Sequence, residues 1–284
     1  MTRLLTTRWR DRYDEIVIGF ANTGEERPET LNFGHLCDQT FGFNTVWVEA
    51  DVQLEKGDGT RHRIVSYNTA SRNGEPFEAM IKKYGIPNSK APQCTRELKS
   101  YALMSYLRSI GWERGSYDHA IGFRADEPAR RHPDAAKTRT VYPLMDWLPV
   151  TKPHVNQFWM KQSFRLELTG YQGNCKWCWK KSLRKHMTLL SEDQSLYDFP
   201  ERMEALYGEV GAEFSKEYRP GYKRVFFRGN LSTKDLRAAY EKNKESLERA
   251  EDDSIILPSG DLFPLDLEEG GCVESCEVGF EEAA

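Results

Sequence analysis

The sequence contains no apolar run that approaches the roughly 20 residues a helix needs to cross a bilayer, and its mean hydropathy is -0.70. Residues 1–6 lack the apolar core of a signal peptide. The six cysteines, irregularly spaced in 284 residues, do not form the framework of a small disulfide-stabilised secreted domain. These absences predict a protein that works in a reducing cytoplasm and not in a membrane.

Charge is distributed unevenly along the chain. The formal net charge is -4, but residues 248–284 contain 12 acidic residues and one basic residue, so residues 1–247 carry +7. A mildly basic body favours a phosphate-bearing ligand. The acidic end is expected to be a solvated tail or a competitor for the basic surface.

The first 70 residues have the pattern of a layered α/β fold. Residues 15–21 form an apolar run typical of a buried strand, and residues 28–42 carry the start and stop signals of a helix. A second β-rich run covers residues 45–50. Strand, helix and strand with short joints predict a parallel pair. Residues 51–67 are expected to form an inserted hairpin around a Gly-Asp-Gly turn.

The rest of the chain is predicted to be rich in helices. Ser232 and Asp235 have the spacing of a capping box that starts the last helix. We predict an α/β protein with an open, mostly parallel sheet flanked by helices, a main domain over residues 1–190, a helical extension over 191–250 and an acidic tail over 251–284. Helices are expected over residues 77–84, 95–110, 154–168, 180–190, 199–207 and 232–250, and a buried strand over 117–123.

Three cysteines indicate sulfur or metal chemistry. Cys175 and Cys178 form a Cys-x-x-Cys segment, in which two thiolates can bind one soft metal ion or cluster. A third ligand must come from elsewhere in the fold, and Cys94 is the upstream candidate.

Four segments in this order resemble motifs of the phosphoadenosine phosphosulfate reductase family, within the adenine-nucleotide alpha-hydrolase superfamily, and particularly its phage-encoded members. The resemblance covers residues 15 to about 185. The segments are 20–31 with Asn22-Thr23-Gly24, 122–128 with Arg131 beyond it, 142–147 with Pro143-Leu144-Met145-Asp146-Trp147, and 170–178 with Gly170-Tyr171 and the Cys-x-x-Cys.

The resemblance implies a substrate and its binding residues. Its reductases convert an adenylylated sulfate to sulfite and an adenosine phosphate, with a thioredoxin-like protein as reductant. Asn22, Thr23 and Gly24 would border the adenine nucleotide at the end of a strand. Arg124 and Arg131 would hold the anion with their planar donors. The alternatives are an ordinary strand-to-helix turn and surface salt bridges of the two arginines.

The resemblance also implies an iron–sulfur cluster. Iron–sulfur members use a Cys-Cys pair and a Cys-x-x-Cys, and Gln93 replaces one of those cysteines here. Cys94, Cys175 and Cys178 would then hold a [4Fe-4S] cluster with one open iron. Zinc, or three reduced thiols without metal, are the alternatives.

Two further cysteines lie in the acidic tail. Cys272 or Cys276 could complete a four-thiol site for a cluster or for zinc. The segment around Cys276 is also similar to the C-terminal redox-cysteine segment of the resembled reductases. Its thiolate would attack the sulfur of a bound sulfonucleotide, although neighbouring acids raise a thiol pKa.

Basic and aromatic residues interleave around the Cys-x-x-Cys segment, as they do in nucleic-acid grooves. This pattern leaves open a nucleic-acid thiolating enzyme, or a non-catalytic zinc-stabilised relative. A solvated helix face with tryptophans in the core is the simpler interpretation. The residues are Lys176, Trp177, Trp179, Lys180, Lys181, Arg184 and Lys185.

One departure from the superfamily concerns the start of the chain. The Ser-Gly-Gly-rich phosphate loop that defines the superfamily would stand before Thr2 and is absent. Residues 2–13 are similar to the end of the helix that follows that loop. Without the strand before it, the middle of the sheet would lose a pairing partner. We therefore expect Met1 to be an internal methionine of a longer reading frame.

Overall fold

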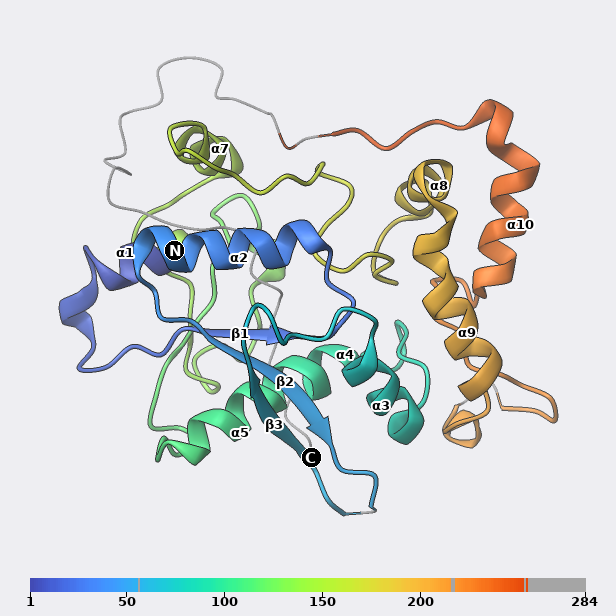
Figure 1. Ribbon diagram of the computed structural model, residues 1–284, viewed down its shortest axis with the longest axis horizontal. Helices are drawn as coiled ribbons and strands as arrows, with labels where there is room; N and C mark the ends of the chain where they lie inside the picture. The colour runs from blue at the N-terminus through green and yellow to red at the C-terminus, as the bar shows by residue number, and fades with distance from the viewer. Residues whose placement is uncertain (56, 216–217, 253, 255–284) are drawn as a thin grey trace.

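The computed structural model describes residues 1–55, 57–215, 218–252 and 254, and its elements are labelled in Figure 1. The strands are β1 (Gly19–Asn22), β2 (Val46–Val52), β3 (Thr60–Val65), β4 (His119–Ala120) and β5 (Thr140–Val141). The α-helices are α1 (Thr2–Thr6), α2 (Pro28–Phe41), α3 (Glu75–Tyr84), α4 (Gln93–Thr95), α5 (Ala102–Ser109), α6 (Pro143–Asp146), α7 (Lys152–Met160), α8 (Leu183–Glu192), α9 (Asp198–Tyr207) and α10 (Thr233–Asn243). A π-helical segment, η2 (Arg96–Tyr101), joins α4 to α5, and the short 3₁₀ turns are η1 (Arg10–Arg12), η3 (Pro128–Arg130), η4 (Gln194–Tyr197), η5 (Ala212–Phe214) and η6 (Lys244–Ser246).

The described strands form two small sheets. β1 pairs with β2 in parallel, with Gly19 opposite Val46, and β2 pairs with β3 as an antiparallel hairpin. β4 pairs with β5 in parallel. The protein is therefore α/β, with a mixed three-stranded sheet and a parallel two-stranded sheet flanked by helices. The parallel pair follows the prediction from sequence. The hairpin forms around the predicted turn, but its first arm is β2 itself and not a separate strand within residues 51–67.

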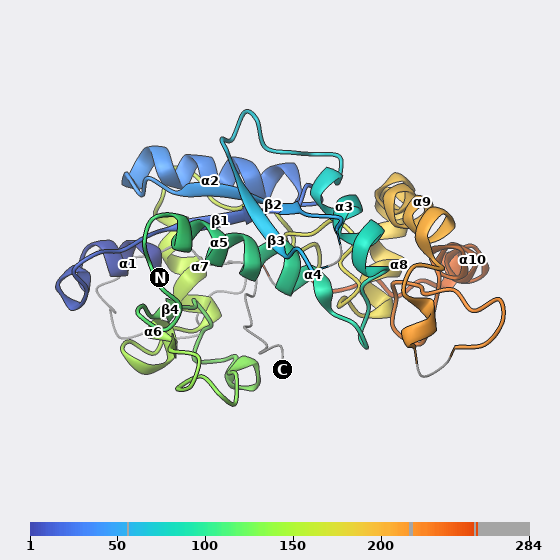
Figure 2. The same cartoon turned by 90° about the horizontal axis from the view of Figure 1, so that it is seen from below.

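Helix α2 is formed as its end signals predict. Pro28 occupies the first turn, and Gly42 ends the helix in the left-handed conformation, where its N–H donates to the Asp38 carbonyl. Gly34 lies against the Trp47 ring of β2. In Figure 2, α2 covers one face of the three-stranded sheet and α5 covers the other.

One apolar core joins the sheet to the C-terminal helices. The same buried cluster contains Val48 of β2, Ile81 of α3, Leu98 of η2, Met203 of α9, and Trp177 of the Cys-x-x-Cys segment. Each of these side chains is fully shielded from solvent. α8, α9 and α10 lie together at one side of the molecule (Figure 1). The Cys-x-x-Cys segment is thus held between the sheet and these helices.

Several predicted elements are shorter than expected, among them the strand over residues 15–21, which forms only at Gly19–Asn22. The helix expected over 154–168 ends at Met160, where Lys161, Gln162 and Ser163 interrupt the apolar spacing. The helix that begins after the Ser232 capping box ends at Asn243 and continues only as the 3₁₀ turn η6 to Ser246, so it does not reach residue 250. The strand expected over 117–123 pairs only at two residues, since β5 beside it is equally short.

A cavity of about 660 Å³ separates the two sheets. Ile18, Gly19 and Ala21 line one side, and Asp118 and Ala120 line the other. Because Val46 donates to the Ile18 carbonyl, Gly19 and Ala21 direct their backbone groups to the opposite edge, toward the cavity. Among the described strands none pairs with that edge of β1.

The length and hydropathy of a helix decide whether it could span a membrane. Within the described part of the chain, no helix combines the length and the apolar character needed to span a bilayer.

Candidate thiol site

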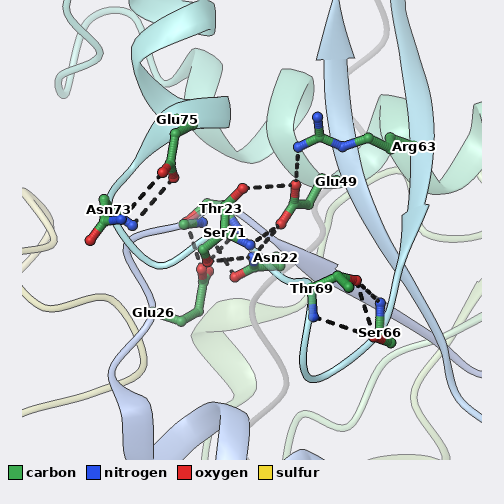
Figure 3. A network of polar contacts seen from close by, with 11 residues as sticks. Asn22, Thr23, Glu26, Glu49, Arg63, Ser66, Thr69, Ser71, Asn73 and Glu75 are labelled. Carbon is green, nitrogen blue, oxygen red and sulfur yellow. Dashed lines mark hydrogen bonds and ion pairs between the residues drawn. The ribbon is translucent and has the colours of Figure 1, made fainter.

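Hydrogen bonds within the turn and to Glu49 and Ser71 hold the end of β1 and the turn after it in place (Figure 3). Asn22 is fully buried; its amide donates to Glu49 Oε1 (2.7 Å) and to the Ser71 carbonyl (2.8 Å). Thr23 donates from its N–H and its hydroxyl to Glu26 Oε2, both at 2.8 Å. The side chains predicted to border a nucleotide are thus committed to contacts within the protein. Their role toward a nucleotide stays a prediction.

Glu49 organises this network from the middle of β2. It is fully buried and accepts from Asn22, from the Ser71 N–H (2.6 Å) and hydroxyl (3.0 Å), and from Arg63 of β3. Figure 3 shows these groups converging on its carboxylate. A buried carboxylate with several donors holds its surroundings in one arrangement. Nothing in the sequence marks Glu49 as a site residue, because it is a single acid within the apolar run of residues 46–50.

Gly24 allows the segment before α3 to pack closely against the turn. Its φ is +83°, and a Cβ at this position would lie 2.9 Å from the Cα of Gly74. The Gly74 N–H donates to the Gly24 carbonyl (3.0 Å) just before α3 begins. Only glycine combines this backbone conformation with so close an approach. Gly24 is therefore explained by packing of the backbone.

The Cys-x-x-Cys segment docks directly on the same turn. The Arg27 N–H donates to the Asn174 carbonyl (2.7 Å), and the Lys176 N–H donates to the Glu25 carbonyl (3.1 Å). The Trp177 indole N–H donates to Glu25 Oε2 at 2.5 Å. These contacts join segments about 150 residues apart in sequence. They hold the two cysteines beside the carboxyl end of β1.

Glu25 is a buried carboxyl group at this junction. It is 2% exposed, and burial raises its pKa to about 7, although Lys176 and the indole hydrogen bond act in the opposite direction. Lys176 Nζ lies 3.9 Å from Glu25 Oε1. The sequence contains Glu25 and Glu26 directly after the strand, but nothing in it shows that a distant tryptophan covers one of them.

The two cysteines of the segment interact with each other. The Cys175 thiol donates a hydrogen bond to Cys178, which raises the pKa of Cys175 and lowers that of Cys178. Lys181 lies beside both sulfurs and favours their charged forms, while its Nζ donates to the Cys175 carbonyl (2.7 Å). The site can therefore hold a thiolate at Cys178 with a proton on its neighbour.

Cys94 lies near this pair, on the short helix α4. Burial raises the pKa of its thiol, and Cys178 raises it further, so the two sulfurs are close enough to influence each other. Trp179 lies beside Cys94. Among the described residues, however, no set of three Cys, His, Asp or Glu side chains is arranged to hold a metal ion. The structure brings the three thiols into one neighbourhood without forming a metal site.

The predicted anion-binding arginines lie in ion pairs. Arg124 Nε lies 3.0 Å from Asp126, and its Nη2 lies 3.3 Å from Glu127. Arg131 pairs with Asp146 and stacks over the Tyr142 ring at 4.8 Å. These contacts are the surface salt bridges given above as the alternative. Anion binding by Arg124 and Arg131 stays a prediction.

The tryptophans of the basic segment are buried. Trp177 is 0% exposed and Trp179 is 6% exposed, so neither indole presents a face for stacking on a base. Lys180 lies over the Trp179 ring, and Lys185 Nζ donates to the Gly170 carbonyl. Arg184 pairs with Glu248.

Cys272 and Cys276 lie outside the described residues. The expectations that Cys276 is a nucleophile and that a tail cysteine completes a metal site are therefore not addressed by the described structure.

The chain is 28% identical over 264 residues to a protein of Escherichia phage lambda described as "Uncharacterized nin region protein ORF290". The match covers 91% of this chain and 84% of that protein. No family model matches the sequence. No solved structure matches it. The relative's description carries no activity, so function has to be argued from the thiol site.

Proposed function

We propose that this protein is a sulfonucleotide reductase-like enzyme that uses Cys175 and Cys178 to reduce or transfer the sulfur of an adenylylated sulfate. The proposal is supported above all by the hydrogen-bonded thiol pair, with its charge on Cys178 and Lys181 beside it. A thiolate is the form of cysteine that attacks sulfur. The pair also lies at the carboxyl end of a parallel strand, where α/β folds commonly bind nucleotides.

The chemistry needs both thiols and one external reductant. The Cys178 thiolate attacks the sulfate sulfur, an S–S bond forms, the S–O bond to the phosphate breaks, and the adenosine phosphate leaves. Cys175 then attacks Cys178 Sγ, which forms the disulfide and releases sulfite. Two electrons pass from the thiol pair to sulfur, and a dithiol such as a thioredoxin-like protein restores the pair. Lys181 would favour the thiolate and attract the anionic substrate.

The wider assignment is part of the same proposal. The chain would be an adenine-nucleotide alpha-hydrolase-like protein, in which the parallel pairs β1–β2 and β4–β5 are parts of one open sheet. The similarity to a phage lambda protein supports a phage-borne origin, and the proposed enzyme would act in the cytoplasm of a host.

A metal centre is the second candidate, favoured by the position of Cys94 near Cys178. Among the described residues Cys94, Cys175 and Cys178 do not form a three-ligand set as they lie, so a [4Fe-4S] cluster or zinc would require the three thiols to move closer together. No step above passes through such a group. Anaerobic purification followed by iron and zinc analysis tests it: stoichiometric metal that is lost in Cys94→Ser would support the second candidate.

The test of the first candidate measures sulfite release. The full chain is incubated with adenosine 5′-phosphosulfate, with or without a 3′-phosphate, and with a dithiol. We expect sulfite from the wild type, none from Cys178→Ser, and a trapped S-sulfonate on Cys178 in Cys175→Ser. Cys37→Ser is the matched control, since Cys37 is a buried thiol of α2. A wild type that forms neither sulfite nor S-sulfonate contradicts the proposal.

A further inference from the structure

Helix α7 begins with a capping box that uses a histidine. Thr151 is the N-cap residue, and His154 is the third residue of the helix. The Thr151 N–H donates to His154 Nδ1 (3.0 Å), and the Thr151 hydroxyl lies 2.7 Å from the same nitrogen. In the common capping box this acceptor is the side-chain oxygen of glutamate or glutamine. A histidine in this place can change its charge near neutral pH.

The hydrogen bond from the Thr151 backbone fixes the protonation state of the imidazole. A backbone N–H can only donate, so Nδ1 of His154 offers a lone pair, and the hydrogen of the neutral ring is on Nε2. When the ring takes up a second proton, Nδ1 carries a hydrogen and no longer accepts. It can still donate to the Thr151 hydroxyl, but the Thr151 N–H loses its acceptor.

The surroundings of His154 favour the neutral ring. Burial lowers the pKa of His154, while Asp126 acts in the opposite direction. The N-terminus of a helix also disfavours a positive charge. Charged groups around the start of α7 are also Lys152, Asp252 near Lys152, and Arg124, which pairs with Asp126. The neutral ring therefore persists to a pH below the ordinary histidine value of about 6.5, and the hydrogen bond is lost as the pH falls further.

The next amide of α7 holds a neighbouring segment. The Lys152 N–H donates to Asp126 Oδ2 (3.2 Å), and the Ala125 N–H donates to the carbonyl of Val150, just before the helix (2.8 Å). These bonds join residues 124–127 to the first turn of α7. An imidazolium in that turn would attract the Asp126 carboxylate away from the amide, and a frayed turn would no longer present the amide to it.

We propose that the start of α7 is a pH-sensitive switch, in which neutral His154 keeps the first turn closed on residues 124–127 and protonation of Nδ1 opens it. The segment that is released carries Arg124, so its ion pair with Asp126 should loosen at the same time. The switch uses neither the Cys-x-x-Cys segment nor a nucleotide. It is therefore independent of the proposed reduction.

The capping box of α10 provides a comparison within the same molecule. There the Ser232 N–H donates to Asp235 Oδ2 (2.8 Å), so a carboxylate takes the place of the imidazole. Hydrogen bonds from Ser232 lower the pKa of Asp235 below its ordinary value of 3.8. This cap should stay closed at a pH at which the cap of α7 opens.

Hydrogen–deuterium exchange of the full chain, followed by NMR from pH about 7.5 to about 5, tests the switch. After correction for the intrinsic pH dependence of exchange, the amides of Thr151, Lys152 and Ala125 should become roughly two- to thirtyfold less protected at the acidic end, as expected for loss of an N-cap. The amides at the start of α10 should not change. The nitrogen NMR shifts of the His154 ring should show an unprotonated Nδ1 at neutral pH, a measurement that needs no variant.

Two variants assign the response to one ring. His154→Gln supplies an amide oxygen that can accept from Thr151 at every pH, so it should fold as the wild type does and lose the response. His62→Gln is the matched control and should keep the response, because His62 lies on β3 and bonds to Ser105. The proposal is overturned if His154→Gln keeps the response, if α7 and α10 respond equally, if residues 124–127 do not respond, or if Nδ1 of His154 carries a hydrogen at neutral pH.

Discussion

Replacing Glu25 with glutamine should remove a defined part of the pH dependence of stability. The folded protein raises the pKa of this carboxyl from 4.5 to about 7, chiefly through burial. Between these values the folded state keeps a proton that the unfolded state has lost, so stability falls as the pH rises from about 4.5 to 7. At about 1.4 kcal/mol for each pH unit between the two pKa values, the wild type loses roughly 3 kcal/mol over this range. Glutamine has no proton to lose, and its oxygen can still accept from Trp177.

The assay is urea unfolding of the wild type and Glu25→Gln at pH values from about 4.5 to 8. The difference between the two proteins isolates Glu25, since other titrating groups such as His119, His186 and Cys178 are common to both. The difference should move by about 3 kcal/mol in favour of the variant as the pH rises. Parallel pH profiles would refute the reasoning, because they would mean that the carboxyl is not buried as described.

Three further predictions concern the turn and the thiols. Asn22→Ala should lower the free energy of unfolding by about 2 kcal/mol, because it removes a donor from the buried carboxylate of Glu49; denaturant titration that finds no loss would contradict the network. Gly24→Ala should lower it by more than 1 kcal/mol, since φ is +83° and the added Cβ meets the neighbouring backbone; calorimetry gives the value. Cys178 should be alkylated by iodoacetamide with a midpoint below the ordinary thiol pKa of 9, as followed by mass spectrometry. Cys37 is the internal comparison, and equal pH profiles for the two cysteines would be inconsistent with a stabilised thiolate.

The elements that sequence predicts well are those whose signals are local. Helix α2 has Pro28 at its start and Gly42 at its end, and the structure forms it between them. The β2–β3 hairpin follows from its Gly-rich turn and two alternating runs. In both cases the residues that decide the structure lie within the element.

The site was less predictable because its residues depend on distant partners. Arg27 belongs to a charged run that is typical of a surface, but it is 8% exposed, and its N–H donates to the Asn174 carbonyl of a distant segment. In the sequence Glu49 only interrupts an apolar strand. The structure shows that Asn22 and Ser71 donate hydrogen bonds to its carboxylate. The spacing of Cys175 and Cys178 predicts that the two thiols lie close together. It does not predict that Cys175 keeps its proton while Cys178 becomes the thiolate.

The cavity between β1 and β4 has a consequence for how the molecule opens. No described ladder hydrogen bond crosses it, so the two sheets can separate there without breaking strand pairing. The amides of Gly19 and Ala21 should therefore exchange with deuterium sooner than that of Val48, which lies in the centre of its sheet. Separation of the two sheets at the cavity would expose strand edges that can pair with extended segments of other molecules. The tendency of the protein to aggregate at high concentration therefore depends on how rarely the two sheets separate.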